Sequence, residues 1–251
     1  MRIALKFAYN GKKFHGYARQ PNLKTVEGEL IRTLIKQGII KDTKESYFRP
    51  ASRTDKCVSA LGNVVAFNTD VSKEIILKNL TDELSSILLY GLKEVEPEFN
   101  PRHAKYRQYK YYLPIANLEI EKIISTLNCF TGKHDFRNFA KLEAHRNPIR
   151  TIDNILFTQE NDILIIDFFS QTFLWHQIRR IISALIKVGS GKLEKEEISK
   201  ALNRPEKKVD FGLAPAKPLI LKDVVYNFKF EYDTFQLKKL KQVEKEIISC
   251  L

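Results

Sequence analysis

The sequence has few cysteines and no long apolar run. Its three cysteines form neither a C-x-x-C pair nor a disulfide framework. Isolated thiols of this kind predict a reducing, cytoplasmic compartment. Apolar runs such as residues 163–166 are far shorter than the roughly 20 residues of a membrane-spanning helix. Because Arg2 and Lys6 interrupt the first apolar segment, we expect no signal peptide there.

Negative charge is also scarce. Subtracting 30 Asp and Glu from 42 Lys and Arg leaves a net charge of +12. Such a surplus favours a polyanionic partner, and without a membrane-like segment the expected partner is nucleic acid. The 251 residues are 43% hydrophobic, which is ordinary for a folded protein with one large domain or two small ones.

Hydrophobic periodicity predicts alternating strands and helices. Ile3, Leu5 and Phe7 alternate with other residues, which indicates a strand at the start of the chain. Val26, Leu30 and Leu34 recur at helical spacing, which predicts a helix over residues 25–37. Further strands are predicted at 46–49, 63–68, 92–95, 106–113, 151–157, 163–169 and 224–230. Further helices are predicted at 72–88, 120–127, 173–188 and 234–250.

The order of these elements predicts the fold class. Each half of the chain runs β-α-β-β-α-β, the order found in ferredoxin-like folds. We therefore expect an α/β (α+β) protein of two ferredoxin-like halves that share a mainly antiparallel central sheet, with a basic cleft between them. The prolines at 97 and 101 mark the best boundary. The predicted segments are 1–99, 100–232 and a C-terminal helix over 233–251.

A charged loop is predicted over residues 49–63. Arg53, Asp55 and Lys56 lie within four residues of one another. Neighbouring cations favour the ionised form of a carboxyl group, and an ionised carboxylate on a loop can act as nucleophile or general base. The alternative is a solvated aspartate that caps a turn.

The segment 101–114 combines basic and aromatic residues without an acidic one. Cations attract phosphates while aromatic rings stack on unpaired bases, so this pattern favours nucleic-acid binding. In the alternative reading, the tyrosines of an edge strand pack in the core and its lysines are solvated. The residues concerned are Arg102, Lys105, Arg107, Lys110, Tyr106, Tyr109, Tyr111 and Tyr112.

One arginine of the predicted helix 173–188 lies beside its apolar stripe. Ile178, Ile182 and Leu185 form that stripe, and Arg179 is adjacent to it. A half-buried arginine requires an anion, which is a carboxylate or a phosphate. A purely structural ion pair is the competing interpretation.

Two segments resemble ligand-binding motifs but lack residues that those motifs require. The segment 189–192 resembles the end of a phosphate-binding loop, but Ile186 stands where that motif needs glycine, and Leu193 where it needs Ser or Thr. His134 and Asp135 have no further ligands at metal-binding spacing. We therefore expect neither a metal site nor a dinucleotide cofactor.

Residues 53–56, RTDK, followed by Val58, Ser59 and Ala60, resemble the catalytic loop of TruA-type tRNA pseudouridine synthases, in the variant of the archaeal and eukaryotic branch. Blocks similar to this family recur in the same order along nearly the whole chain. They lie at residues 9–11, 16–17, 19–20, 25–27, 107–111, 132–136, 149–152, 173–180, 188–192, 213–215 and 219–221.

The resemblance implies an isomerase that breaks the N-glycosidic bond of a uridine in the tRNA anticodon stem-loop, rotates the base and rejoins it through carbon. It assigns Asp55 as the essential carboxylate, Arg179 as its cationic partner and Tyr109 as the ring against the target base. Family members act as homodimers, without metal or organic cofactor. The candidate phosphate-binding residues are Arg19, Arg53, Lys56, Lys105, Arg107, Lys110 and Arg180.

The chain departs from the family pattern at Cys57, where glycine is usual. The turn after Asp55 therefore either avoids the left-handed backbone region or tolerates strain there. The C-terminal helix lies outside the resemblance. Two other functions stay open at this point: a non-catalytic RNA-binding protein that uses the tyrosine strand, and a metal-dependent nuclease built around Asp55, His134 and Asp135.

Overall fold

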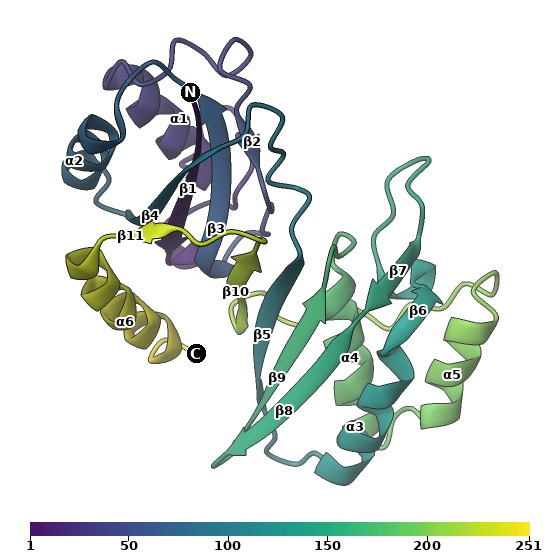
Figure 1. Cartoon of the computed structure of the whole chain (residues 1–251). Coiled ribbons are helices and arrows are strands. Elements are labelled where there is room, and N and C mark those ends of the chain that lie inside the picture. The colour runs from purple at the N-terminus through teal and green to yellow at the C-terminus, as the bar shows by residue number, and fades with distance from the viewer. The chain divides into compact units, whose positions relative to one another are not determined.

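The computed structural model describes residues 1–251, apart from the side chains at positions 78, 81 and 82. The chain forms two compact units (Figure 1). The first unit comprises Met1–Lys105 with Ile220–Leu251, and the second comprises Tyr106–Leu219. Both combine helices with mostly antiparallel strands, so the predicted α/β class is confirmed. The shared sheet and the basic cleft stay predictions.

A central strand, β1, organises the first unit. It pairs antiparallel with β3 on one side and β4 on the other. β10 adds a parallel pairing to β3, through Ile220 and Leu221, and β2 and β11 are short additions to β3 and β4. The strands are β1 (Arg2–Tyr9), β2 (Arg49–Pro50), β3 (Ser59–Asn68), β4 (Ile87–Val95), β10 (Leu219–Val225) and β11 (Glu231–Tyr232).

Helices of the first unit contact both faces of this sheet, which explains why every residue of β1 is buried. Tyr9 is buried, and its ring lies 6.4 Å from that of the buried Tyr17 between centroids. Asn10 follows Tyr9 in the chain, and its side-chain Nδ2 donates to Glu246 of α6 (3.2 Å). The helices are α1 (Val26–Lys36), α2 (Lys73–Glu83) and α6 (Thr234–Ile248).

The second unit is built on an antiparallel sheet in the order β5-β9-β8, with a separate two-stranded sheet of β6 and β7. Helix α3 packs on α4, where Gly189 leaves room for Ile123; a Cβ at Gly189 would lie 2.7 Å from its Cδ1. The elements are β5 (Tyr106–Pro114), α3 (Ile120–Leu127), β6 (Gly132–Asp135), β7 (Ile149–Ile152), β8 (Asn154–Glu160), β9 (Ile163–Ser170), α4 (Gln177–Gly189) and α5 (Lys195–Asn203).

Several predicted boundaries are wrong, each for a tertiary reason. The helix predicted over 72–88 ends at Glu83, because Ile87 and Leu88 pair with β1 as part of β4. The strand predicted over 46–49 is reduced to Arg49–Pro50, and Tyr47 has a left-handed φ of 45°. The strand predicted over 224–230 is instead Leu219–Val225.

The helix that carries Arg179 also begins later than predicted. It starts at Gln177 rather than at residue 173, because His176 adopts a left-handed conformation with φ 64°. The side-chain Oε1 of Gln177 accepts a hydrogen bond from Leu174 N (2.8 Å), which stabilises the turn before the helix. The predictions of β1, α3 and the β8–β9 hairpin are confirmed.

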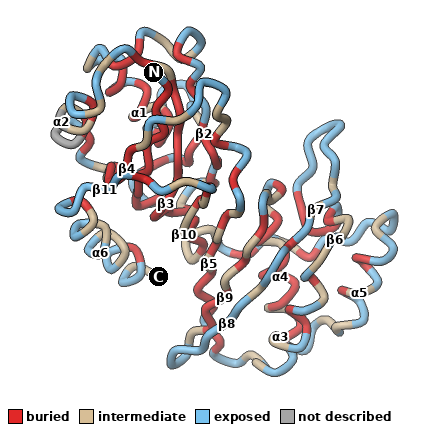
Figure 2. Tube along the Cα trace, viewed as in Figure 1, coloured by how far each residue is buried: buried red, intermediate tan, exposed pale blue. Residues whose placement is uncertain are grey.

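The compact units are bounded differently from the predicted segments 1–99, 100–232 and 233–251. The first unit extends to Lys105 and takes in residues from Ile220 onward, because β10, β11 and α6 pack on the N-terminal strands (Figure 2 shows the burial of those strands). The three-segment division stays a prediction. None of the helices in the described chain has both the length and the apolar character that a membrane crossing requires.

Candidate active site

The Asp55 loop connects β2 to β3 in the first unit. Asp55 is half-buried, whereas Arg53 and Lys56 are exposed beside it. The loop is tied at its base, because Asn63 Nδ2 donates to Ser52 O (3.0 Å). This bond ties the start of the loop to β3, and the two cations beside Asp55 lie in solvent.

Residues 9–17 hold the loop immediately before Asp55. The hydroxyl groups of Tyr9 and Thr54 share a hydrogen bond (Oη···Oγ1 2.8 Å), and the backbone N–H of Tyr17 donates to Thr54 O (3.1 Å). Thr54 is therefore held through both its side chain and its carbonyl. Tyr17 is fully buried, and burial raises the pKa of its hydroxyl well above the usual range.

Two glycines allow this close approach. A Cβ at Gly11 would lie 2.4 Å from Val58 O, and the Gly11 N–H donates to Ser59 Oγ (3.0 Å). Gly16 has a φ of 98°, and a Cβ there would lie 3.3 Å from Lys56 N. The segments 9–11 and 16–17, for which the sequence predicted no contact with the Asp55 loop, thus form its scaffold.

The backbone conformation of Cys57 decides between the two alternatives for the turn after Asp55. Its φ is 69°, so the turn after Asp55 enters the left-handed region that glycine occupies more readily. The expectation that the turn tolerates strain is confirmed, and the expectation that it avoids this region is wrong. A residue other than glycine rarely adopts this conformation, and it does so only where the surrounding structure holds it.

The tyrosine strand is β5 of the second unit. The ring of Tyr109 is 8% exposed and meets Phe173 edge-on, with 5.3 Å between ring centroids. Tyr111 is buried and donates from its hydroxyl to Pro215 O (3.1 Å), and burial raises its pKa to about 12. The two tyrosines on one face of β5 therefore differ, since Tyr109 lies at the margin of the core and Tyr111 inside it.

The predicted phosphate-binding cations are not equally exposed. Arg107 is 6% exposed, and its guanidinium donates to Gln171 O. Lys110 is half-buried, with its ammonium 3.4 Å from Asp167. Arg180 pairs with Asp210 (2.8 Å).

In the first unit, Arg19 is exposed and lies 3.9 Å from Glu27. Of the predicted phosphate-binding cations, Arg53 and Lys56 are the exposed ones that flank Asp55 in the sequence.

Arg179 is anchored within its own unit. Its side-chain Nε donates to Ala214 O (2.8 Å), and Ala214 N donates back to the Arg179 carbonyl (3.1 Å). The side chain is half-buried, as its position beside the apolar stripe predicts. The first unit thus brings together Asp55, Arg53 and Lys56, and the second holds Tyr109 and Arg179. The pairing of Asp55 with Arg179 stays a prediction.

The alternative metal centre, around Asp55, His134 and Asp135, requires several ligating side chains close together. Among the described residues, no group of three or more His, Cys, Asp and Glu side chains has an arrangement that would hold a metal ion. Asp135 is paired with Arg137 (2.6 Å), and His134 Nε2 lies 3.0 Å from Thr131 O.

Comparison with known proteins decides between the remaining functions. A family model described as tRNA pseudouridine synthase matches residues 127–227. A Thermococcus sibiricus protein named tRNA pseudouridine synthase A is 45% identical over 246 residues, which cover 96% of this chain and 91% of that protein. The chain belongs to the tRNA pseudouridine synthase family. The resemblance read from the sequence is therefore confirmed.

Other members of the tRNA pseudouridine synthase family match along almost the full chain. A Pyrococcus abyssi protein of the same name is 42% identical and covers 98% of this chain and 93% of its own length. A Methanosphaera stadtmanae protein, also of that name, is 39% identical and covers 98% of this chain and 92% of its own. The similarity thus includes α6, which the sequence analysis placed outside the resemblance.

The comparison with solved structures is much weaker. An H/ACA RNP bound to a substrate RNA containing 2'-deoxyuridine aligns over 73% of this chain and 44% of that chain. The identity is 12% and the TM-score 0.36, so this likeness carries no argument about the chain.

Proposed function

We propose that the protein isomerises uridine to pseudouridine in tRNA, with target uridines in the anticodon stem-loop. Family membership over 96% of the chain supports the reaction and the tRNA substrate. The observation that carries the proposal is the loop of Asp55. It holds a half-buried carboxylate between two exposed cations on a scaffold of close backbone contacts.

The reaction exchanges one bond to the ribose for another. The bond between N1 of uracil and C1′ breaks, the base turns, and C5 bonds to C1′. C5 then loses its proton while N1 gains one, so the product is an isomer and no oxidant is needed. Asp55 would act as a carboxylate whether it attacks the sugar or the base or removes a ribose proton, and Arg53 and Lys56 flank it in the loop.

Arg179 is the proposed partner of Asp55. A guanidinium offers donors in a rigid fork that matches a carboxylate, and such charge-assisted pairs are among the strongest hydrogen bonds in proteins. The bond from Nε to Ala214 O supports this role, because it fixes the plane of the guanidinium.

Tyr109 is the proposed platform for the target base. A uridine inside a stem must leave the base stack, which costs a few kcal/mol. Stacking on an aromatic ring returns about 1–3 kcal/mol per base. The edge-on contact with Phe173 supports this role, since it holds the ring of Tyr109 in one orientation.

Cations of both units are proposed to bind the tRNA backbone. Exposure supports direct phosphate contacts for Arg19, Arg53 and Lys56. Lys110 would exchange Asp167 for a phosphate. Because Arg107 is buried, its contribution would be to hold the tyrosine strand through Gln171 O.

A homodimer in the cytoplasm belongs to the same proposal. Its dimeric state can be measured by light scattering of the purified protein. The half-buried free thiols support a reducing compartment.

The experiment that tests the reaction is pseudouridine mapping in a tRNA by primer extension after carbodiimide treatment. We expect adducts with the wild-type protein and none with Asp55→Asn, while Asp55→Asn still binds tRNA. Asp70→Asn is the matched control, because Asp70 is exposed and has no assigned role. As a further arm, Arg179→Lys should lose at least tenfold in rate because the fork is lost, whereas the exposed Arg204→Lys should not.

Three outcomes contradict the proposal. Wild-type activity in Asp55→Asn rejects the assigned carboxylate. A wild-type protein that binds tRNA without forming adducts is a non-catalytic RNA-binding protein. Shortened tRNA, formed only when a divalent metal is supplied and lost in EDTA, indicates a nuclease instead.

A further inference from the structure

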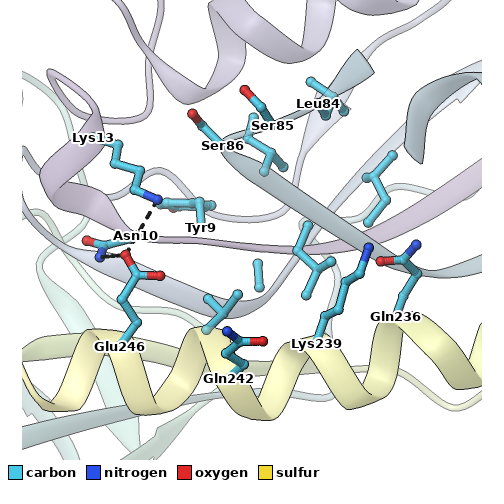
Figure 3. A pocket seen from close by; sticks show the side chains of 15 residues that line it. Tyr9, Asn10, Lys13, Leu84, Ser85, Ser86, Gln236, Lys239, Gln242 and Glu246 are labelled. Carbon is cyan, nitrogen blue, oxygen red and sulfur yellow. Dashed lines mark hydrogen bonds and ion pairs between the residues drawn. The ribbon is translucent and has the colours of Figure 1, made fainter. Parts of the chain in front are cut away.

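A polar pocket lies in the first unit beneath α6. Its volume is about 370 Å³, and it opens between α6, the end of β1 and the segment that enters β4 (Figure 3). This pocket, called the α6 pocket below, contains none of the residues assigned to the reaction, and it shares Tyr9 and Asn10 with the scaffold of the Asp55 loop. Its polar lining includes Asn10, Lys13, Ser85, Ser86, Lys239 and Gln242.

Two lysines give the α6 pocket a positive charge that one carboxylate only partly offsets. Glu246 Oε1 lies 3.4 Å from Lys13 Nζ and accepts a hydrogen bond from Asn10 Nδ2. Among the described side chains no carboxylate pairs with Lys239, whose ammonium lies 4.5 Å from the centroid of the Phe235 ring. Figure 3 shows Lys239 pointing from α6 into the space beneath the helix. The pocket thus presents a cation to an incoming anion.

Amides and hydroxyls make up the rest of the polar lining. Gln242 and Ser85 are exposed at the pocket. Gln236 is 4% exposed, and its Oε1 has no hydrogen-bond partner among the described residues. Such groups pair with the donors and acceptors on the edge of a nucleobase. The volume falls within the roughly 300–1,000 Å³ of pockets that hold small ligands, a range that includes one nucleotide.

The α6 pocket is connected to the Asp55 loop by the chain itself. Tyr9 lines the pocket, and its hydroxyl bonds to Thr54, the residue before Asp55. Asn10 also lines it, and the next residue, Gly11, packs against Val58 in the same loop. Residues that line the α6 pocket are therefore bonded to, or adjacent in the chain to, residues that hold the Asp55 loop.

We propose that the α6 pocket binds one unpaired nucleotide of the tRNA, with its phosphate at Lys239 and its base against Gln242. The inference rests on the proposed function, because it takes the tRNA as substrate. It assigns a role to α6, a helix whose function the sequence did not reveal. It also gives a role to Lys239 and Gln242, which line the pocket and are exposed to solvent there.

The test compares tRNA binding by Lys239→Glu and Lys241→Glu over roughly 50 to 200 mM salt. Both variants make the same charge change on α6, but Lys241 is exposed and does not line the pocket. For Lys239→Glu we expect weaker binding and a plot of log K against log salt that is shallower by about 0.7–0.9, the value of one phosphate contact. For Lys241→Glu we expect the wild-type slope. Gln242→Ala should weaken binding several-fold without changing the slope, because it removes no charge.

Each other outcome overturns the proposal. Equal changes of the salt slope in both lysine variants indicate a non-specific electrostatic attraction between tRNA and α6. A wild-type salt slope in Lys239→Glu means that no phosphate binds at Lys239. Uridine monophosphate alone gives a further outcome. If it binds the wild-type protein as tightly as tRNA does, and does not bind Lys239→Glu, the pocket is a site for a free mononucleotide. Circular dichroism checks that each variant is folded. Binding is measured without turnover, so a protein that forms no pseudouridine would refute the proposed function and leave the pocket result standing.

Discussion

Replacing Gly11 by alanine tests whether residues 9–17 position the Asp55 loop. The added methyl carbon would lie 2.4 Å from Val58 O and 2.8 Å from the carbonyl carbon of Cys57. Carbon contacts are favourable only near roughly 3.5–4.0 Å. The neighbouring atoms are backbone rather than the end of a flexible side chain, so the loop has to move away from Gly11 by about 1 Å to restore a contact of that length.

This displacement affects both stability and rate. Forcing extra volume into a packed site costs about 1–3 kcal/mol. For a chain of this size, each kcal/mol lowers the Tm by about 2–4 °C. The displaced peptide follows Asp55 closely in the chain, and a misplacement of about 1 Å can slow a reaction by about 10²-fold. We therefore expect Gly11→Ala to lower the Tm by several degrees and the rate of pseudouridine formation by about 10²-fold.

The assay is single-turnover pseudouridine formation at a temperature where every protein tested is folded. Gly38→Ala is the control, because a Cβ there meets no atom within 4 Å and introduces only the strain of its φ of 64°. We expect Gly38→Ala to lose some stability but no rate. Should Gly11→Ala fail to fold, Ser59→Ala removes the bond from Gly11 N and should still slow the reaction. A folded Gly11→Ala protein with the wild-type rate would refute the reasoning.

The remaining predictions concern stability. Cys57→Gly should raise the free energy of unfolding by about 0.5–1 kcal/mol in urea titrations, because relief of the left-handed backbone (about 1–2 kcal/mol) exceeds the entropy cost of glycine; a less stable variant would show that packing of the thiol dominates. The pKa of Tyr111 rises from 10.0 to about 12 because the hydroxyl is buried. The unfolded chain therefore loses this proton first as the pH rises above about 10, so stability is complete below that pH and falls as the pH approaches about 12. Urea unfolding from about pH 8 to pH 12 should show this fall, and Tyr111→Phe should reduce it; an unchanged pH dependence in that variant would contradict the assignment.

Local pattern was enough to predict many elements of the fold. Helix α3 has the predicted bounds, and the β8–β9 hairpin forms around the polar turn between its strands. The prediction failed at Ile87 and Leu88, where apolar residues at helical spacing belong to β4. Their partners are Tyr9 and Ala8 of β1, far away in the sequence. A short apolar run does not reveal such a partner, because helix and strand bury it equally well.

The start of α4 shows the same limit. Residues 173–176 have the apolar and aromatic character of a helix, yet they form a turn, with Trp175 exposed and its ring 4.3 Å from the Lys141 ammonium. Lys141 N also donates to Trp175 O (2.8 Å). This contact with a distant loop outweighs the local preference for helix.

What the amino-acid sequence determined by itself is the chemistry: the ionisable group at Asp55, its cationic neighbours, the tyrosine strand and the basic surplus that suits RNA. These depend on which residues are present and on their spacing along the chain. Only the tertiary structure decided that Gly11 and Tyr17 support the Asp55 loop, that Arg107 is buried, and that α6 covers a polar pocket. The physical reason is that burial and hydrogen bonding depend on which distant segments come into contact, and that is settled by packing of the whole unit rather than by the neighbours of any one residue.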